Sequence, residues 1–235
     1  VSDTFNITVE AFNIAEQYQT PVIVLSDQEI AQRKEVISPI DTSAIKLVER
    51  LRPHGAELEK YARFRYTESG VSPISHPGMK GGNYQGAGIE HNEMGSPTGS
   101  GAVHAKMNDK RFRKFNALKA RQDLFMIEGD PDAPVALIAW GSVAGVAREA
   151  LQRCTAEGLK VKLLVPYLLY PIASDIYQEF FAGVEAGFVV EQSHQGQLYR
   201  IIRMYVDVPQ GVEPFCRSGA NPFQPAELVE RVRSA

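Results

Sequence analysis

The chain has 235 residues, enough to bury the core of one large or two small domains. Its hydrophobic content of 44% and charged content of 23% are ordinary for a globular protein. A net charge of -3 and a pI near 6.0 provide no basic surface for nucleic acid. No apolar run approaches the roughly 20 residues that cross a bilayer, and Val1-Ser2-Asp3 does not begin a signal segment. We therefore expect neither a nucleic-acid nor a membrane partner.

The two cysteines, Cys154 and Cys216, exclude several kinds of site. One pair is not a disulfide framework, which indicates a reducing compartment, most simply the cytoplasm. An iron–sulfur cluster typically needs four thiolates, as does an all-cysteine zinc site, so this chain alone can hold neither. Neither cysteine is a convincing nucleophile, because Cys154 faces a predicted core and Cys216 has no paired histidine.

Residues 3–36 predict one helix and one strand. Apolar residues recur at helical spacing from Ile7 to Tyr18, and a second apolar face predicts a helix buried on most sides. Residues 21–25, Pro-Val-Ile-Val-Leu, are typical of a short strand buried on both faces. One helix and one strand cannot make a sheet. We therefore expect the last helix–strand unit of an α/β domain whose earlier part is missing, as the start at Val1 also suggests.

Residues 38–132 are predicted to be largely irregular. Glycine, proline, serine and histidine are concentrated in residues 67–101, and so long a stretch without periodicity is uncommon in a compact domain. We expect a functional or partner-binding loop rather than disorder, because apolar residues such as Tyr84 and Met94 can anchor it. Residues 106–123 then form a basic, helix-forming stretch, which is more often a solvated helix face than a ligand site.

Residues 133–235 show the clearest pattern, in which strands and helices alternate. This alternation predicts an α/β fold with a parallel sheet covered by helices on both faces. The predicted strands are residues 135–140, 161–165 and 188–191. The predicted helices lie around residues 147–154 and at residues 172–182, 196–206 and 226–233.

The densest polar cluster is Glu90-His91-Asn92-Glu93. Metal ligation would call for a helical pattern such as H-E-x-x-H, which is absent. A hydrogen-bonded or ion-paired loop at a subunit contact is the main interpretation, and a role in binding substrate or cofactor is the alternative. His194 follows the third strand, where a loop histidine would line the carboxyl edge of the sheet.

Gly141-Ser142 lies between a strand and a helix, like the entrance to a nucleotide-binding turn. The pattern is Gly-Ser-Val-Ala-Gly rather than G-x-G-x-x-G, and the next strand ends without an acidic residue for a ribose hydroxyl. A tight structural turn is therefore the preferred interpretation over dinucleotide binding. No Ser/His/Asp set stands out elsewhere.

Several segments occur in a specific order and spacing that span nearly the whole chain, although each motif is weak alone. They are residues 11–27, 70–73, 76–79, 81–82, 88–95, His104, Met107, 110–114, 139–142, 149–150, 157–158, 190–191, 196–198, 219–223 and 225–228. Together they resemble the alpha subunits of 2-oxoacid:ferredoxin oxidoreductases, the 2-oxoglutarate type more than the pyruvate type.

The resemblance implies a subunit of an enzyme that converts a 2-oxoacid and coenzyme A to acyl-CoA and CO2 and passes electrons to ferredoxin. Thiamine diphosphate would carry the chemistry, and the beta subunit is expected to hold the diphosphate, Mg2+ and a [4Fe-4S] cluster. A heterodimer or a dimer of heterodimers is expected. The family residues that contact the thiamine ring and substrate precede Val1, so no catalytic residue is assigned here.

The resemblance also implies three regions. Residues 1–37 would end a thiamine pyrimidine-binding domain, residues 38–132 would link two domains, and residues 133–235 would form a transketolase C-terminal-like domain. The segment is expected to be structural and to bridge subunits. Residues expected in an interface or ligand-approach loop are Gly81, Gly82, Glu90, His91, Glu93 and His194.

Two alternatives share the predicted fold. One is the C-terminal domain of a transketolase or pyruvate-dehydrogenase-like enzyme, which should lack residues 88–93 and the basic run 110–114. The other is a non-catalytic regulatory or assembly module, because a fold does not by itself define a function.

Overall fold

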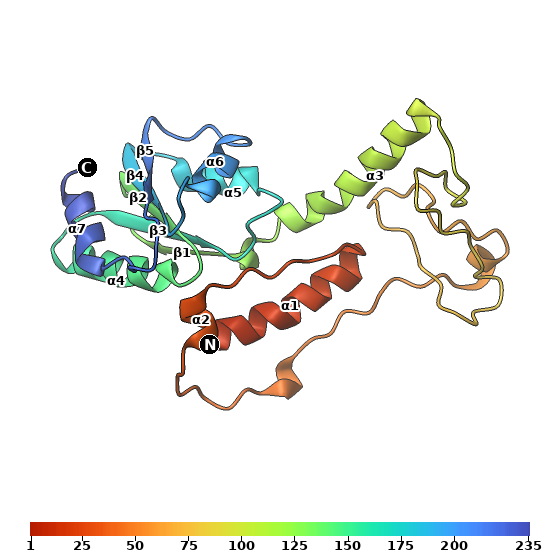
Figure 1. Cartoon of the computed structure of the whole chain (residues 1–235), viewed down its shortest axis with the longest axis horizontal. Helices are drawn as coiled ribbons and strands as arrows, with labels where there is room; N and C mark the ends of the chain where they lie inside the picture. The colour runs from red at the N-terminus through yellow and green to blue at the C-terminus, as the bar shows by residue number, and fades with distance from the viewer. The chain divides into compact units, whose positions relative to one another are not determined.

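The computed structural model describes residues 1–235, which form two compact units (Figure 1). Unit 1 comprises Val1–Val24 and Lys34–Leu118, and unit 2 comprises Leu25–Arg33 and Lys119–Ala235. None of the helices combines the length and the apolar character needed to cross a membrane.

Unit 2 contains a five-stranded mixed sheet in the order β1-β3-β2-β4-β5. The pairs β3–β2, β2–β4 and β4–β5 are parallel, whereas β1 runs antiparallel to β3. The predicted α/β class and the three predicted strands are confirmed, but the sheet is not wholly parallel. The strands are β1 (Phe125–Gly129), β2 (Val135–Ala139), β3 (Val161–Pro166), β4 (Ala186–Glu191) and β5 (Gly211–Cys216).

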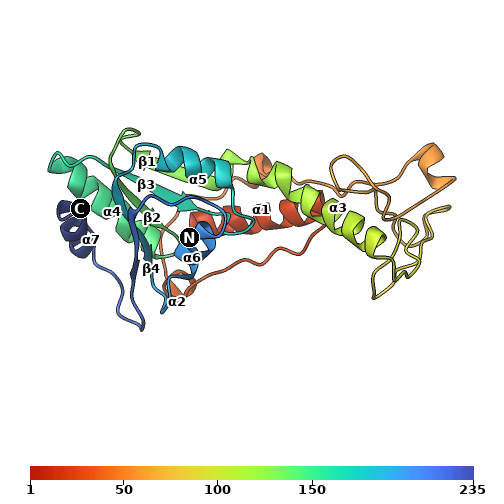
Figure 2. The same ribbon diagram turned by 90° about the horizontal axis from the view of Figure 1, so that it is seen from above.

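Helices cover both faces of this sheet (Figures 1 and 2). On one face, α4 (Val143–Ala156) packs against α7 (Pro225–Arg233) and against β2 and β3. Leu137 and Leu163 are fully buried in the core on that side, together with Cys154. On the other face lie α5 (Ser174–Phe181) and α6 (Gln197–Arg203). The bounds of the four helices agree with the predicted bounds to within a few residues. The largest shortening is in α6, which ends at Arg203 rather than at residue 206.

The two edge strands, β1 and β5, were not predicted from the sequence, and each has a physical reason. In β1 only Phe125 is buried, so the strand lacks the continuous buried run of a central strand. In β5, Pro214 interrupts the pattern, but a proline is tolerated on an edge strand because one side has no ladder to join. Both strands are therefore fixed by their neighbours more than by their own composition.

Unit 1 contains two long helices and no regular strand. They are α1 (Ser2–Tyr18) and α3 (Gly101–Lys119), whose last residue belongs to unit 2. Between them the chain is irregular apart from two short 3-10 turns, η1 (Thr42–Ala44) and η2 (Gly55–Leu58). The predicted irregular stretch is thus confirmed for residues 38–100, whereas the helix expected at residues 106–123 begins and ends earlier, and residues 125–129 form β1. The remaining short elements, α2 (Gln28–Gln32) and η3 (Gln122–Leu124), belong to unit 2.

Two expectations for the first residues are wrong. Residues 21–25 form no strand, and Ile23 is 82% exposed rather than buried on both faces. Unit 1 offers no strand whose N–H and C=O groups could pair with this segment, so its strand-forming composition has no ladder to enter. The helix α1 is present, but only Asn13, Ile14 and Tyr18 are buried in it, and Phe12 is exposed.

One buried hydroxyl group in unit 2 lacks a hydrogen-bond partner, and its removal tests the packing of the core. The Tyr177 side chain on α5 is fully buried, and its hydroxyl has no hydrogen-bond partner. Burial raises the pKa of this phenol far above its usual range. We expect Tyr177→Phe to raise the free energy of unfolding by about 1 kcal/mol, because it removes an unpaired polar atom from the core.

Tyr61→Phe is the matched control for chemical denaturation. The Tyr61 hydroxyl is also buried, but it donates to Pro73 O at 3.0 Å and accepts from Ser75 N at 2.9 Å. Its removal should lower stability by about 1–3 kcal/mol. Equal destabilisation by the two substitutions would contradict this account of Tyr177.

Candidate functional site

The candidate site is a loop of residues 83–100, called the Glu90 loop, that leads into α3 of unit 1. The start of the helix is tied to the loop, because the Ser100 carbonyl accepts from His104 N at 3.0 Å. The Thr98 hydroxyl accepts from Ser100 N at 3.2 Å. Thr98 N donates to Glu90 O at 3.0 Å, which closes the loop on itself.

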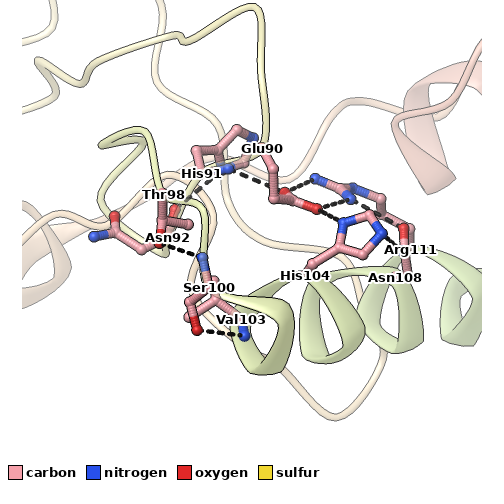
Figure 3. A network of polar contacts seen from close by, with 9 residues as sticks. All are labelled: Glu90, His91, Asn92, Thr98, Ser100, Val103, His104, Asn108 and Arg111. Atoms are coloured by element: carbon pink, nitrogen blue, oxygen red, sulfur yellow. Dashed lines mark hydrogen bonds and ion pairs between the residues drawn. The ribbon is translucent and has the colours of Figure 1, made fainter.

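The Glu90 carboxylate is the centre of the loop (Figure 3). Arg111 of α3 donates to both of its oxygens, at 2.8 and 3.1 Å. Oε2 also lies 2.5 Å from His104 Nδ1, and Oε1 accepts from the His91 N–H at 3.0 Å. These bonds, with those from Arg111 the strongest, hold the pKa of Glu90 far below its usual range. Glu90 is therefore an anion that bridges the loop and the helix.

Asn108 sets the orientation of the histidine in this network. Arg111 Nη1 donates to Asn108 Oδ1 at 3.1 Å, so the Asn108 amide nitrogen must face the other way. That nitrogen lies 3.1 Å from His104 Nε2, which therefore accepts the bond. His104 Nδ1 then carries the hydrogen that it donates to Glu90. This tautomer is assigned from the hydrogen-bond pattern.

The next residues form a tight turn around Asn92. Its side-chain oxygen accepts from Met94 N at 2.9 Å and from Ser96 N at 3.2 Å. Gly95 has φ +88°, and a Cβ there would come within 1.8 Å of Gln85 O. Only glycine fits this position, so any other residue there would displace the turn from Gln85.

His91 and Glu93 attach the turn to the preceding segment of unit 1. The His91 ring is 9% exposed and lies with its centroid 3.9 Å from that of Phe64. Glu93 O accepts from Phe64 N at 2.9 Å, and its carboxylate accepts from Tyr66 N at 2.7 Å. Both side chains serve to fix the loop, and neither is presented to solvent as a free reactive group.

The other predicted residues lie elsewhere. Gly81 and Gly82 belong to a close packing contact, since a Cβ on Gly82 would lie 2.7 Å from Ser75 Cβ. His194 is in unit 2, where its Nδ1 lies 3.0 Å from Ser218 Oγ. The structure thus brings Glu90, His91 and Glu93 into one loop. It does not add His194 to that loop.

Sequence reasoning did not assign the α3 residues of the network to a site. His104, Asn108 and Arg111 have the spacing i, i+4, i+7, which places them on one face of a helix. That spacing could have predicted a polar face directed at an acidic loop residue. The basic composition of residues 106–123 instead favours a solvated helix face, whereas Arg111 is half-buried against Glu90.

In unit 2, the turn at Gly141-Ser142 is bonded to a carboxylate of the chain itself, that of Asp27. Asp27 Oδ2 accepts from Ser142 N at 2.8 Å at the beginning of α4, while Oδ1 accepts from Ile30 N at 2.9 Å. Burial alone would raise the pKa of Asp27, but these N–H groups outweigh it and lower the pKa. A helix N-terminus favours an anion, and here Asp27 supplies it.

No three His, Cys, Asp or Glu side chains in the chain lie close enough to hold a metal ion. Both cysteines are free thiols: Cys154 is buried and Cys216 half-buried, and burial raises the pKa of each. Two thiols are fewer than the four that an iron–sulfur cluster typically needs.

Two family models match the chain. Residues 1–109 match the thiamine-diphosphate-binding domain of pyruvate flavodoxin/ferredoxin oxidoreductases, and residues 133–228 match core domain II of pyruvate:ferredoxin oxidoreductases. Among solved structures, the chain is similar to 2-oxoglutarate:ferredoxin oxidoreductase from Magnetococcus marinus, with 2-oxoglutarate, coenzyme A and succinyl-CoA bound. That likeness has 38% identity and a TM-score of 0.93, and it covers 99% of this chain and 40% of the other.

Curated relatives agree with this match. Subunit alpha of 2-oxoacid:ferredoxin oxidoreductase 2 from Aeropyrum pernix is 31% identical over 88% of this chain and 32% of its own length. The 2-oxoglutarate oxidoreductase subunit KorA of Mycobacterium tuberculosis is 33% identical over 86% of this chain and 30% of its own length. The chain thus spans about a third of the length of these relatives.

Lys110, on α3, makes the stability of unit 1 depend on pH. Its side chain is 8% exposed, and Nζ donates to Gly70 O at 3.0 Å. Burial, followed by the charges of Lys114 and Arg63, lowers the pKa of Lys110 to about 8. Between this value and the unfolded value of about 10.5, the unfolded chain binds more protons, so stability should rise with pH.

We expect this rise to approach about 3 kcal/mol from pH 8 to pH 10.5, at about 1.4 kcal/mol for each pKa unit. Urea unfolding of the wild type and of Lys110→Met across this range measures it, because other titrating groups are common to both proteins. The variant should lack the additional rise. Identical pH dependence in the two proteins would contradict a buried, charged Lys110.

Proposed function

Because the chain belongs to the family of 2-oxoacid:ferredoxin oxidoreductase alpha subunits, we propose that it is a structural, subunit-bridging region of such an enzyme. The complete enzyme would use thiamine diphosphate to convert a 2-oxoacid and coenzyme A to acyl-CoA and CO2. Two electrons would leave the substrate and pass to ferredoxin. The family assignment also favours this function over the transketolase-like alternative.

The proposed substrate is 2-oxoglutarate. The observation that carries this proposal is the likeness to the Magnetococcus marinus enzyme, which extends over 99% of this chain at 38% identity. The 2-oxoglutarate synthase subunit KorA of Methanocaldococcus jannaschii supports it at 25% identity over 99% of this chain and 61% of its own length.

The proposed role of the chain is structural, because the charged side chains of the Glu90 loop are engaged in fixing the loop itself. When bound elsewhere in the enzyme, thiamine diphosphate would supply a nucleophilic carbon and an electron sink. The Mg2+ and [4Fe-4S] cluster would be held by the beta subunit or by other parts of the alpha subunit. No proton transfer or bond cleavage is assigned to a residue of this chain.

The Glu90 loop is the proposed subunit contact. Its polar groups are satisfied internally, while Tyr84, Ile89 and Met94 are 44%, 68% and 54% exposed. Large apolar side chains on a fixed loop suit a protein interface, because little conformational freedom is lost on binding. We assign this contact to the beta subunit. Gly81 and Gly82 would support the loop from the adjoining packing contact, and His194 would act separately at the edge of the unit 2 sheet.

The exposed apolar run at residues 21–25 supports the proposed domain division. In this proposal, residues 1–37 complete the sheet of a thiamine pyrimidine-binding domain, and neighbouring strands from that domain cover the run. Residues 38–132 link it to a transketolase C-terminal-like domain at residues 133–235. Such a sheet would provide the hydrogen-bond partners that unit 1 lacks.

The test is reconstitution of the full-length alpha subunit with its beta subunit. We expect ferredoxin reduction that requires both 2-oxoglutarate and coenzyme A, with a higher kcat/KM for 2-oxoglutarate than for pyruvate. Omission of coenzyme A and of each subunit in turn are the controls. A reconstituted complex that reduces ferredoxin with neither 2-oxoacid would contradict the proposed activity and favour a non-catalytic assembly module.

A further inference from the structure

Three cationic side chains of unit 1 bind oxygen atoms of Gln19 and of residues 70–72. Lys114 Nζ donates to Gln19 O at 3.0 Å, and Arg63 Nη2 donates to Gln19 Oε1 at 2.8 Å. Arg63 Nη1 also reaches Ser72 O at 3.4 Å, and Lys110 Nζ donates to Gly70 O at 3.0 Å. We call Arg63, Lys110 and Lys114 the cation cluster.

These cations have no carboxylate partner in unit 1, unlike three of its arginines. Arg50 pairs with Glu16, Arg65 with Glu57 and Arg111 with Glu90. Within unit 1, no carboxylate forms an ion pair with any member of the cation cluster. The carboxylate whose charge acts on Lys110 is Glu93, and it is already bonded to the Tyr66 N–H.

The cluster is also partly removed from water. Lys110 is 8% exposed, while Arg63 and Lys114 are half-buried. Burial lowers the pKa of all three, and mutual repulsion adds to this effect for the two lysines. Neutral carbonyl oxygens, including those at the end of α1, compensate the charge only in part.

Each of these cations retains unused donors. A lysine ammonium has three N–H donors, and each lysine uses one of them in the contacts above. Arg63 has five, of which Nη1 and Nη2 reach Ser72 O and Gln19 Oε1, and its guanidinium also interacts with the Tyr84 side chain. Arg63 and Lys114 both contact Gln19 and both are half-buried, so each side chain is in part reachable from solvent.

We propose that the cation cluster binds an oxyanion, either a free phosphate-like or carboxylate ligand or an acidic side chain of the assembled enzyme. The shared chemistry is a charged group with two or more oxygens. Such a group would replace repulsion among three cations by attraction and would engage N–H donors that no protein oxygen now uses. The proposal concerns residues outside the Glu90 loop and does not depend on the enzyme's substrate.

The probe is inorganic phosphate, added to the chain at constant ionic strength. At a concentration about ten times its Kd, phosphate should raise the folded-to-unfolded ratio about elevenfold. The variants Arg63→Met and Lys114→Met should lose this effect. Lys60→Met, at an exposed lysine of unit 1 outside the cluster, should keep it.

A binding measurement separates loss of the site from loss of folding. Phosphate binding is followed by calorimetry at about pH 8.5 in buffers of different ionisation enthalpy, for variants whose circular dichroism matches the wild type. Wild-type binding should take up protons, because the anion favours the charged form of Lys110. Arg63→Lys, which retains the charge, should restore part of the affinity that Arg63→Met loses.

The assembled enzyme distinguishes the two sources of the oxyanion. Phosphate that binds both the chain and the complex indicates a free ligand. Phosphate that binds the chain alone indicates that a protein carboxylate occupies the cluster after assembly. Absence of cluster-dependent phosphate binding to the chain, or equal binding by wild type, Arg63→Met and Lys114→Met, overturns the inference. Ferredoxin reduction is assayed separately, so this result leaves the proposed activity untouched.

Discussion

The pairing of Glu90 with Arg111 is the contact on which the irregular part of unit 1 depends. Unit 1 has no sheet, so the backbone groups between its two long helices cannot be satisfied by a strand ladder. Side chains supply the partners instead. Glu90 joins the loop to α3, Asn92 accepts from N–H groups within the loop, and Glu93 accepts from Tyr66 N of the preceding segment. The loop is consequently held without regular secondary structure.

Unit 2, in contrast, is stabilised by a sheet and an apolar core. Its sheet satisfies the backbone, and apolar side chains of β2, β3 and α4 form a continuous core. Side-chain carboxylates act at the ends of its elements, as Asp27 does at the beginning of α4. With that position occupied, the turn at Gly141-Ser142 is a structural junction between residues 25–33 and the sheet. This agrees with its lack of a dinucleotide-binding pattern.

The parts predicted from sequence are those that local pattern determines. The strands β2, β3 and β4 are apolar runs, and α4 carries its buried residues at helical spacing, so composition was sufficient. The edge strands β1 and β5 depend on their neighbours, and no pattern within them revealed that. Residues 21–25 show the reverse case, because a strong strand composition is not enough when no partner strand is present in the unit.

The candidate site was predicted only in part. The polar run at residues 90–93 identified the loop, but its partners on α3 lie 14 to 21 residues further along the chain. Lys110 is buried whereas Phe112, two residues further on, is exposed, although hydrophobicity alone would predict the opposite. The reason is that α3 packs against carbonyl-rich loops, where an ammonium group finds acceptors that a phenyl ring cannot use.

The central claim is that Glu90 and Arg111 together fix a loop that contacts the beta subunit. A double-mutant cycle tests it directly, with the affinity of full-length alpha subunit for beta subunit measured for Glu90→Gln, Arg111→Met and the double variant. Each single substitution should weaken binding about tenfold, and the double variant should be no weaker than the single ones, because both remove one interaction. Wild-type affinity in all three variants, or losses that simply add, would contradict the account.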